Sequence, residues 1–205
     1  MSTCGPLVAL LVLASGVALA AAPAGPETAR ATFAAGCFWC VESDFDKVPG
    51  VLSTTSGYMG GTKKDPTYEE VSAGGTGHAE VVQVEYDPKK VSYAQLLQVF
   101  WHNVDPLTPN AQFCDKGNSY RSAIFVADAE QRRLAEESLR ALQASRRFDR
   151  PIVTELLPAA EFYPAEEYHQ DYYRKNPVRY RYYRFACGRD ARLKELWGKD
   201  AGGHG

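Results

Sequence analysis

The stretch Ala31-Thr-Phe-Ala-Ala-Gly-Cys-Phe-Trp-Cys-Val-Glu42 decides how the chain folds, because it joins a predicted strand to a predicted helix. The helix is expected from about Cys37 to Lys47, where the following Pro49 and Gly50 stop it. A cysteine at such a junction lies among free backbone N–H groups at the positive end of the helix dipole, which favours its thiolate. Cys37 is therefore predicted to be a nucleophile by its position.

Further strands and helices follow this unit in an alternating order. The pattern of apolar residues, capping boxes and turn residues predicts a strand over 51–58, a strand over 79–86, a helix over 92–104, a strand over 119–127, a helix over 128–145 and a strand over 152–157. The order strand-helix-strand-strand-helix-strand predicts an α+β fold, a two-layer ferredoxin-like plait (split βαβ) with helices on one face. The long loop over 105–117 is a candidate site.

The two ends of the chain are expected to differ from this domain. Residues 1–20 are uncharged and apolar and end in Ala18-Leu19-Ala20, which predicts a signal peptide, and 21–28 form a linker. Because Lys and Arg are missing from this segment, an uncleaved anchor stays an alternative. Export to the periplasm or the medium is expected either way, with no stable membrane contact after cleavage. A single domain over 29–198 is expected to continue after Phe162 with a helix and then a largely irregular C-terminal tail that ends in a short helix over 189–197. Residues 199–205 form a disordered end.

Charge and cysteine content exclude several classes of function. Lys+Arg 23 against Asp+Glu 25 leaves a net charge of -2, so nucleic acid is not an expected partner. Cys37, Cys40, Cys114 and Cys187 remain after cleavage, but they include one close pair and the histidines are scattered. No metal site is therefore predicted.

Five segments together carry a resemblance to a known family: Gly36-Cys-Phe-Trp39, Pro66-Thr-Tyr-Glu-Glu-Val71, Gly75-Thr-Gly-His-Ala-Glu-Val81, Gln112-Phe-Cys-Asp-Lys-Gly117 and Ser119-Tyr-Arg-Ser-Ala-Ile124. They resemble the A-type peptide methionine sulfoxide reductases, and the resemblance extends from Phe33 to Trp197. It implies an enzyme without metal or organic cofactor, and nothing in the sequence indicates more than a monomer. Such an enzyme reduces the S-epimer of methionine sulfoxide, protein-bound and free, and is recycled by an external dithiol such as thioredoxin.

The resemblance also implies roles for individual residues. Cys37 becomes the attacking thiolate, and Phe38 and Trp39 hold the methyl group of the substrate. Glu80 becomes the acid that protonates the sulfoxide oxygen, which requires a carboxyl pKa raised by burial. Without the resemblance, the period-two strand around Glu80 favours a side chain that faces solvent.

Three more polar residues take roles from the same comparison. Tyr68 and Tyr120 are implied to donate hydrogen bonds to the sulfoxide oxygen, and Asp115 is implied to order a water. His78 is interpreted instead as a residue that packs the Gly-rich turn, outside the catalytic set.

The other three cysteines leave the resolving thiol open between two answers. Cys187 lies where this family places a resolving cysteine, beside Gly188 in the tail, and we predict a Cys37–Cys187 bridge. Cys40 is close in sequence and stays a candidate second redox thiol, although its sulfur can meet that of Cys37 only after distortion of the helix. Cys114 is expected to be a spectator.

Two other functions stay open from the residues. A bare Cys37-x-x-Cys40 is also typical of an exported thiol-disulfide oxidoreductase. A redox-sensing or binding module could use the aromatic pocket without turnover. The basic and aromatic run over 174–185 is interpreted as tail packing.

Overall fold

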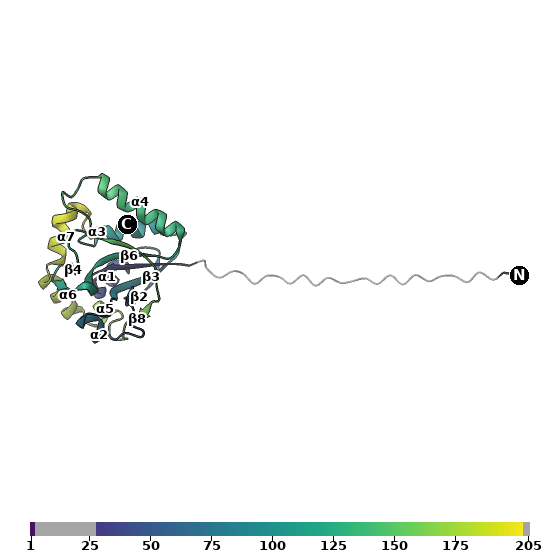
Figure 1. Ribbon diagram of the computed structural model, residues 1–205, viewed down its shortest axis with the longest axis horizontal. Helices are drawn as coiled ribbons and strands as arrows, with labels where there is room; N and C mark the ends of the chain where they lie inside the picture. The colour runs from purple at the N-terminus through teal and green to yellow at the C-terminus, as the bar shows by residue number, and fades with distance from the viewer. Residues whose placement is uncertain (3–27, 203–205) are drawn as a thin grey trace.

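The computed structural model describes residues 1–2 and 28–202, and its centre is a six-stranded sheet with the strand order β7-β6-β1-β3-β2-β8 (Figure 1). β1 pairs with β3 and β6, and β2 pairs with β3 and β8, all antiparallel, whereas β7 joins β6 in parallel. The strands are β1 (Ala29–Ala35), β2 (Val51–Met59), β3 (Ala79–Tyr86), β6 (Ser122–Val126), β7 (Glu155–Pro158) and β8 (Tyr163–Pro164).

The four central strands and two helices make the predicted plait. α1 (Phe38–Phe45) connects β1 to β2, and α3 (Tyr93–His102) connects β3 to β6. Each connection passes over one intervening strand, which is the split βαβ arrangement. The α+β prediction is therefore confirmed. α4 (Ala129–Ala144) follows β6 and leads to β7, which extends the plait by one parallel strand.

One apolar layer between sheet and helices holds these elements together. The ring of Phe33 on β1 stacks on Phe45 of α1 at 4.9 Å and on Phe100 of α3 at 5.4 Å, so both helices cover the same face. Strand alternation sends Ala79 and Val81 of β3 to the opposite face, where they form a smaller cluster with other strand residues and the partly buried Phe162. Glu80, between them, therefore faces the helical layer.

Local capping signals in the sequence are used as expected. Ser92 caps α3 and shares a reciprocal capping box with Gln95, and Asp128 accepts the N–H of Gln131 at the start of α4. Thr67 caps the short α2 (Tyr68–Ala73) in the same way. These contacts position the helices, and α2 in turn presents Tyr68.

The expected long loop over 105–117 contains a small hairpin of its own. β4 (Ala111–Gln112) pairs with β5 (Asp115–Lys116), and the turn between them passes through Phe113, whose φ is 57°. A 3₁₀ helix, η1 (Asn118–Tyr120), then leads into β6, so the strand expected from residue 119 begins at Ser122. The hairpin carries Cys114 and Asp115.

The prediction of a largely irregular C-terminal tail is wrong, whereas the short helix expected over 189–197 is present. The tail forms α5 (Tyr172–Lys175), α6 (Pro177–Ala186) and α7 (Arg189–Trp197), followed by the 3₁₀ helix η2 (Gly198–Asp200). Pro177 fits the first turn of α6. Tyr180 is buried, and Arg184 pairs with Asp44 of α1 at 2.8 Å, so tertiary contacts stabilise a helix that its aromatic composition disfavours.

The predicted signal peptide and most of the linker lie outside the described residues, as do 203–205 of the expected disordered end. The part of that end that is described begins with η2 and donates the N–H of Gly202 to the carbonyl of His102. Within the described part of the chain, no helix combines the length and the apolar character that a membrane crossing requires.

Candidate active site

Cys37 lies at the junction of β1 and α1, as predicted, and caps α1 without a side-chain hydrogen bond to it. Gly36 precedes it with a φ of +79°. A Cβ at Gly36 would approach Cβ of Gln112 to 2.4 Å, so only glycine lets β4 pack against this turn. The nucleophile is thereby placed next to the hairpin that carries Cys114 and Asp115.

A cavity of about 250 Å³ opens in front of the Cys37 thiol. It gathers side chains from five parts of the fold: the start of α1, α2, β3, the β4–β5 hairpin with η1, and α6. The lining residues are Cys37, Phe38, Trp39, Tyr68, Glu80, Asp115, Tyr120 and Tyr183. All the predicted site residues except Cys40 and Cys187 therefore line this cavity. Tyr183, which was not predicted, joins them.

Glu80 is buried at 2% exposure and faces the start of α1. Its Oε2 accepts the backbone N–H of Phe38 at 3.1 Å. Burial raises the pKa of this carboxyl to about 8, against the lowering effect of that N–H. Glu80 is therefore mostly protonated at neutral pH and can donate a proton. The alternation of the strand alone favoured a side chain that faces solvent, and this expectation is wrong.

Two tyrosine hydroxyls share the cavity with Glu80. Burial and the charge of Glu80 raise the pKa of Tyr68 to about 12, and the pKa of Tyr120 is raised in the same way. Both hydroxyls therefore stay protonated and act as hydrogen-bond donors. Three neutral hydrogen-bond donors therefore line the same cavity.

Tyr183 is the lining residue that the sequence analysis missed. It lies on α6 and donates its hydroxyl to Oδ2 of Asp115 at 2.5 Å, and it also contacts the Cys37 thiol. Burial raises the pKa of Asp115, which this hydrogen bond opposes. The signal that could have revealed Tyr183 is its spacing of four residues before Cys187, which puts both on one face of a helix.

Aromatic rings form the apolar wall of the cavity. The Trp39 ring stacks on Tyr172 with centroids 3.8 Å apart, and its Nε1 donates to Nδ1 of His169 at 3.0 Å. His169 also packs against Phe38, with ring centroids 4.9 Å apart. His169 was not predicted, and it fixes the orientation of both wall residues.

Cys40 is buried beside Cys37 and has no disulfide bond. Burial raises the pKa of Cys37, and the adjacent Cys40 raises it further. The pKa of Cys40 is lowered by its hydrogen bond with the Cys37 thiol and by the charges of Arg189 and Arg184. The expected preference of the helix N-terminus for a Cys37 thiolate is thus opposed by burial.

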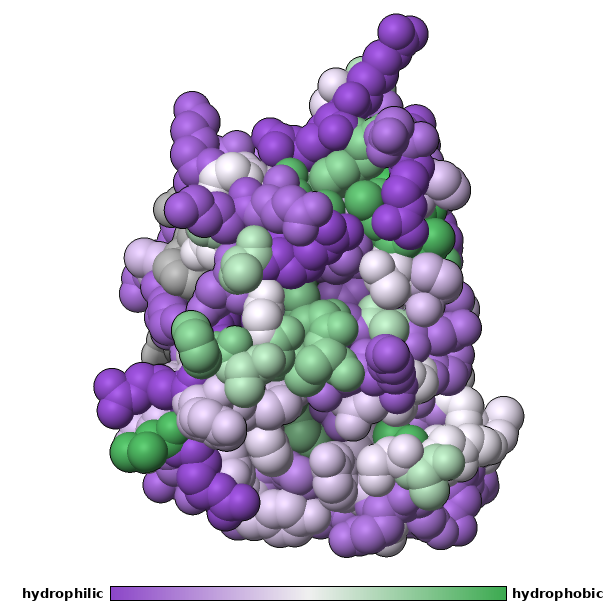
Figure 2. Space-filling view, turned by 90° about the vertical axis from the view of Figure 1, so that its left-hand side faces the viewer, coloured by the Kyte–Doolittle hydropathy of each residue, from purple (hydrophilic) through white to green (hydrophobic). Residues whose placement is uncertain are grey.

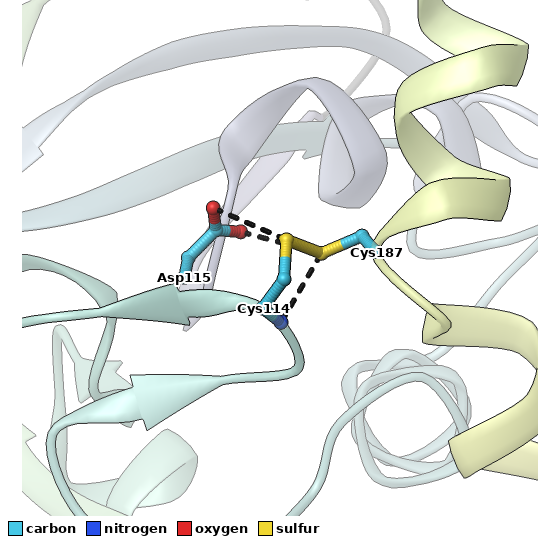
Figure 3. Close-up of side chains that lie close together, drawn as sticks. All are labelled: Cys114, Asp115 and Cys187. Atoms are coloured by element: carbon cyan, nitrogen blue, oxygen red, sulfur yellow. Dashed lines mark hydrogen bonds between the residues drawn. A yellow bond between two sulfur atoms is a disulfide. The ribbon is translucent and has the colours of Figure 1, made fainter.

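The remaining two cysteines form a disulfide. Cys114, exposed on the hairpin, is bonded to Cys187 at the end of α6, across 73 residues of sequence (Figure 3). The N–H of Cys114 donates to Sγ of Cys187 at 3.2 Å. The Asp115 carboxylate lies 3.7 Å from Sγ of Cys114 and 3.9 Å from Sγ of Cys187 (Figure 3).

The expectation that Cys114 is a spectator is therefore wrong, and the bridge in this structure is not the predicted one between Cys37 and Cys187. The reason is the turn at Phe113, which brings the hairpin to the end of α6. Because Tyr183 and Asp115 are close in sequence to the two bonded cysteines and line the cavity, the disulfide lies next to it. The bond between the two sulfurs also removes the thiolates that a metal would need.

His78 has the structural role that was predicted. Its Nδ1 accepts the N–H of Gly61 at 3.1 Å, so the ring proton is on Nε2, which donates to the carbonyl of Lys63 at 2.7 Å. Both nitrogens are occupied in holding the Gly-rich turn.

Comparisons with known proteins agree with this arrangement. The family profile described as "Peptide methionine sulfoxide reductase" matches residues 29–201. "Peptide methionine sulfoxide reductase MsrA" of Bacillus licheniformis is 51% identical over 169 residues, 82% of this chain and 93% of that protein. "Peptide methionine sulfoxide reductase MsrA/MsrB" of Vibrio cholerae is 50% identical over 175 residues, 85% of this chain, and the matched part is 46% of that longer protein.

A solved structure has the same fold. Mxr1 from Saccharomyces cerevisiae in reduced form is similar with a TM-score of 0.70 and 33% identity, over 77% of this chain and 89% of that chain. Mxr1 in complex with Trx2 is similar with a TM-score of 0.50 and 24% identity, over 76% of this chain and 90% of that chain. This second similarity shows the fold alone.

Proposed function

The chain belongs to the peptide methionine sulfoxide reductase family, and from this premise we propose how its cavity reduces the S-epimer of methionine sulfoxide. One observation carries the proposal. The Cys37 thiol, a carboxylic acid kept neutral by burial and an apolar aromatic wall line the same cavity of about 250 Å³. These are the three groups that attack on a sulfoxide requires: a nucleophile for sulfur, an acid for oxygen and a contact for the methyl group.

The wall and the donors orient the substrate. The methyl group of the sulfoxide packs against Phe38 and Trp39, and the oxygen accepts hydrogen bonds from Glu80, Tyr68 and Tyr120. A sulfoxide sulfur is pyramidal, because it carries three different groups and a lone pair. Once the methyl group, the oxygen and the entering side chain are placed, only one epimer presents its sulfur to Cys37.

Attack and proton transfer then proceed together. Sulfur of Cys37 bonds to the sulfoxide sulfur as Glu80 delivers its proton to the oxygen, so no free oxyanion forms. The protonated oxygen then passes from the substrate sulfur to Sγ of Cys37 as the S–O bond and the new S–S bond break, so methionine leaves and Cys37 becomes a sulfenic acid. The substrate is reduced by two electrons and Cys37 is oxidised by two.

Two resolving steps follow. The thiol of Cys187 condenses with the sulfenic acid to a Cys37–Cys187 disulfide and water. The thiol of Cys114 then attacks Sγ of Cys187, which forms the Cys114–Cys187 bond and returns Cys37 as a thiol. The geometric support is the observed bond and its place beside the cavity. In this order Cys187 keeps its predicted role, and Cys114 becomes the second resolving thiol.

An external dithiol closes the cycle. We infer a thioredoxin-like protein as this reductant, in line with the resemblance and with the exposed position of Cys114. In these steps the electrons pass through thiols alone, without a metal or an organic cofactor, as the resemblance implies. Two electrons pass from the dithiol to the Cys114–Cys187 bond, which restores both thiols.

We propose that this chemistry takes place outside the cytoplasm, in a monomer. The apolar segment over 1–20, which ends in Ala18-Leu19-Ala20, favours export. N-terminal sequencing of the protein from a periplasmic fraction tests this proposal. A mature chain that begins at Ala21 is the expected result, and an intact Met1 in the cytoplasm contradicts it.

The central test uses a chiral substrate. The two epimers of N-acetyl methionine sulfoxide are supplied separately with dithiothreitol, and methionine is quantified. Consumption of the S-epimer alone is expected. An exported thiol-disulfide oxidoreductase using Cys37 and Cys40, or a binding module, consumes neither epimer.

A further inference from the structure

The outer face of α6 carries an apolar stripe that has no role in the core. Val178, Tyr182 and Phe185 are 70%, 74% and 83% exposed. Their spacing of four and three residues places them on one narrow face of the helix. We call these three residues the α6 stripe.

The opposite face of α6 explains why the helix forms and does not explain the stripe. Tyr180 is buried, and Arg184 binds Asp44 of α1 and Asp190 of α7. Tyr183 reaches into the active-site cavity. The helix is therefore anchored through one face, which leaves the stripe as a rigid apolar surface in solvent.

The surroundings of the stripe have the composition of a contact surface. Figure 2 views the side on which α6, α7 and β4 lie in Figure 1, and apolar residues gather there in a patch bordered by hydrophilic ones. Arg179 and Arg181 flank the stripe, are exposed and form no ion pair with any described residue. A partner with an apolar surface bordered by carboxylates complements this face.

The stripe leads to the disulfide. Phe185 and the exposed Ala186 directly precede Cys187, and the bonded Cys114 is itself exposed. Within the described residues this is the one disulfide, and the proposed cycle requires a protein dithiol to reach it. A patch of one helix face is small, as expected for brief redox encounters.

The two sulfurs differ in their environment. Cys114 is more exposed than Cys187, so an incoming thiolate reaches it first. The backbone N–H of Cys114, 3.2 Å from Sγ of Cys187, stabilises charge on that sulfur as it leaves. Asp115 lies almost equally far from both sulfurs and does not distinguish them.

We propose that the α6 stripe is the docking surface for the protein dithiol that reduces the enzyme, and that the dithiol attacks Sγ of Cys114. This inference rests on the proposed function. The first thiolate of the partner bonds to Cys114 and releases Cys187 as a thiolate. The second thiol of the partner attacks its own bonded sulfur, which oxidises the partner to a disulfide and releases Cys114.

The test compares two reductants on one variant. Val178→Ala, Tyr182→Ala and Phe185→Ala are combined, since alanine preserves the helix while it removes apolar contact area. Thioredoxin, kept reduced by NADPH and its reductase, is the protein probe, and dithiothreitol is the small one. We expect the KM for thioredoxin to rise by about tenfold or more, while the rate with dithiothreitol stays within about twofold.

Two controls keep the result specific. Leu52→Ala removes a half-exposed apolar side chain on β2, and it leaves the KM for thioredoxin unchanged. Phe185→Ala alone, next to the disulfide, gives a smaller rise and replaces the triple variant if that variant loses its circular dichroism spectrum. A thioredoxin without its second cysteine is then used to trap the mixed disulfide, which is expected on Cys114.

Several outcomes overturn the inference. An unchanged KM for thioredoxin in both stripe variants excludes docking on this face, and a mixed disulfide on Cys187 excludes the order of attack. If the stripe variants raise the KM for an oxidised protein substrate in the dithiothreitol assay, the stripe binds substrate. If the unaltered chain sediments as a dimer and the stripe variants do not, the stripe binds a second copy of the chain. Absence of turnover with dithiothreitol in the unaltered chain refutes the proposed function instead.

Discussion

The two cysteine pairs of this protein differ in almost every physical respect. Cys37 and Cys40 are three residues apart, buried and unbonded. Cys114 and Cys187 are 73 residues apart, lie toward solvent and are bonded. Closeness in sequence therefore did not decide which sulfurs are joined.

The difference separates two tasks of the site. Substrate chemistry requires a dry cavity, where an acid can stay protonated and an aromatic wall can hold a methyl group. Exchange with a protein reductant requires a disulfide that another thiolate can reach. The fold places Cys37 in the first environment and Cys114 in the other, with Tyr183 and Asp115 between them.

The largest effect is expected for Cys37→Ser. Loss of the nucleophile lowers the rate of sulfoxide reduction by ~10³-fold or more, since the remaining groups cannot form the intermediate. Single-turnover release of methionine measures it. Cys40→Ser is the matched control from the same buried pair and still releases one equivalent of methionine. If the two variants behave the other way round, the assignment within the buried pair is reversed.

Glu80→Gln is expected to have the next largest effect. Loss of positioned acid catalysis lowers the rate constant by ~10²-fold, while the Cys37 thiol stays titratable. Since the pKa of Glu80 is about 8, the acid is protonated below that pH, and the unaltered enzyme loses activity as the pH rises above it. This loss of activity at high pH is absent from the pH–rate profile of Glu80→Gln. If the variant still loses activity above that pH, another group titrates there and Glu80 is not the acid.

Cys114→Ser tests the exposed pair and is expected to act only on recycling. The first turnover still releases one equivalent of methionine, but thioredoxin-driven turnover falls by ~10-fold, because the oxidising equivalent stays on the less accessible Cys37–Cys187 bond. Mass spectrometry after one turnover is expected to find that bond. Full thioredoxin-driven turnover in Cys114→Ser contradicts a relay through the hairpin.

Cys40→Ser is expected to have the smallest effect. Its steady-state rate with thioredoxin stays within about threefold of the unaltered enzyme, because Cys40 takes no part in the resolving steps proposed above. The pKa of Cys37 falls in the variant, since Cys40 is one of the groups that raise it, and the absorbance of the thiolate measures this shift. A collapse of thioredoxin-driven turnover makes Cys40 part of the redox cycle.

The sequence was most informative where the controlling interactions are local. The capping box at Ser92 joins residues three positions apart, and α3 begins directly after this N-cap residue. The placement of Cys37 likewise depends on one strand, one glycine and one helix. Strand alternation in β3 was visible as well, but it did not reveal which face was buried.

The sequence was least informative where distant segments meet. The run around Tyr183 was expected to be irregular, and its helix depends on contacts with α1 and α7. His169 orients Trp39 from 130 residues away. No local pattern in the chain encodes such a contact.

By itself the sequence determined the α+β plait, the position of Cys37 at the β1–α1 junction and the family, because periodicity, capping and short motifs are properties of neighbouring residues. Only the tertiary structure decided that Cys114 bonds to Cys187 and that Tyr183 enters the cavity. It also decided that Glu80 holds its proton near neutral pH. The physical reason is the same in each case: bond formation and desolvation depend on which distant segments pack together, and packing is a property of the whole fold.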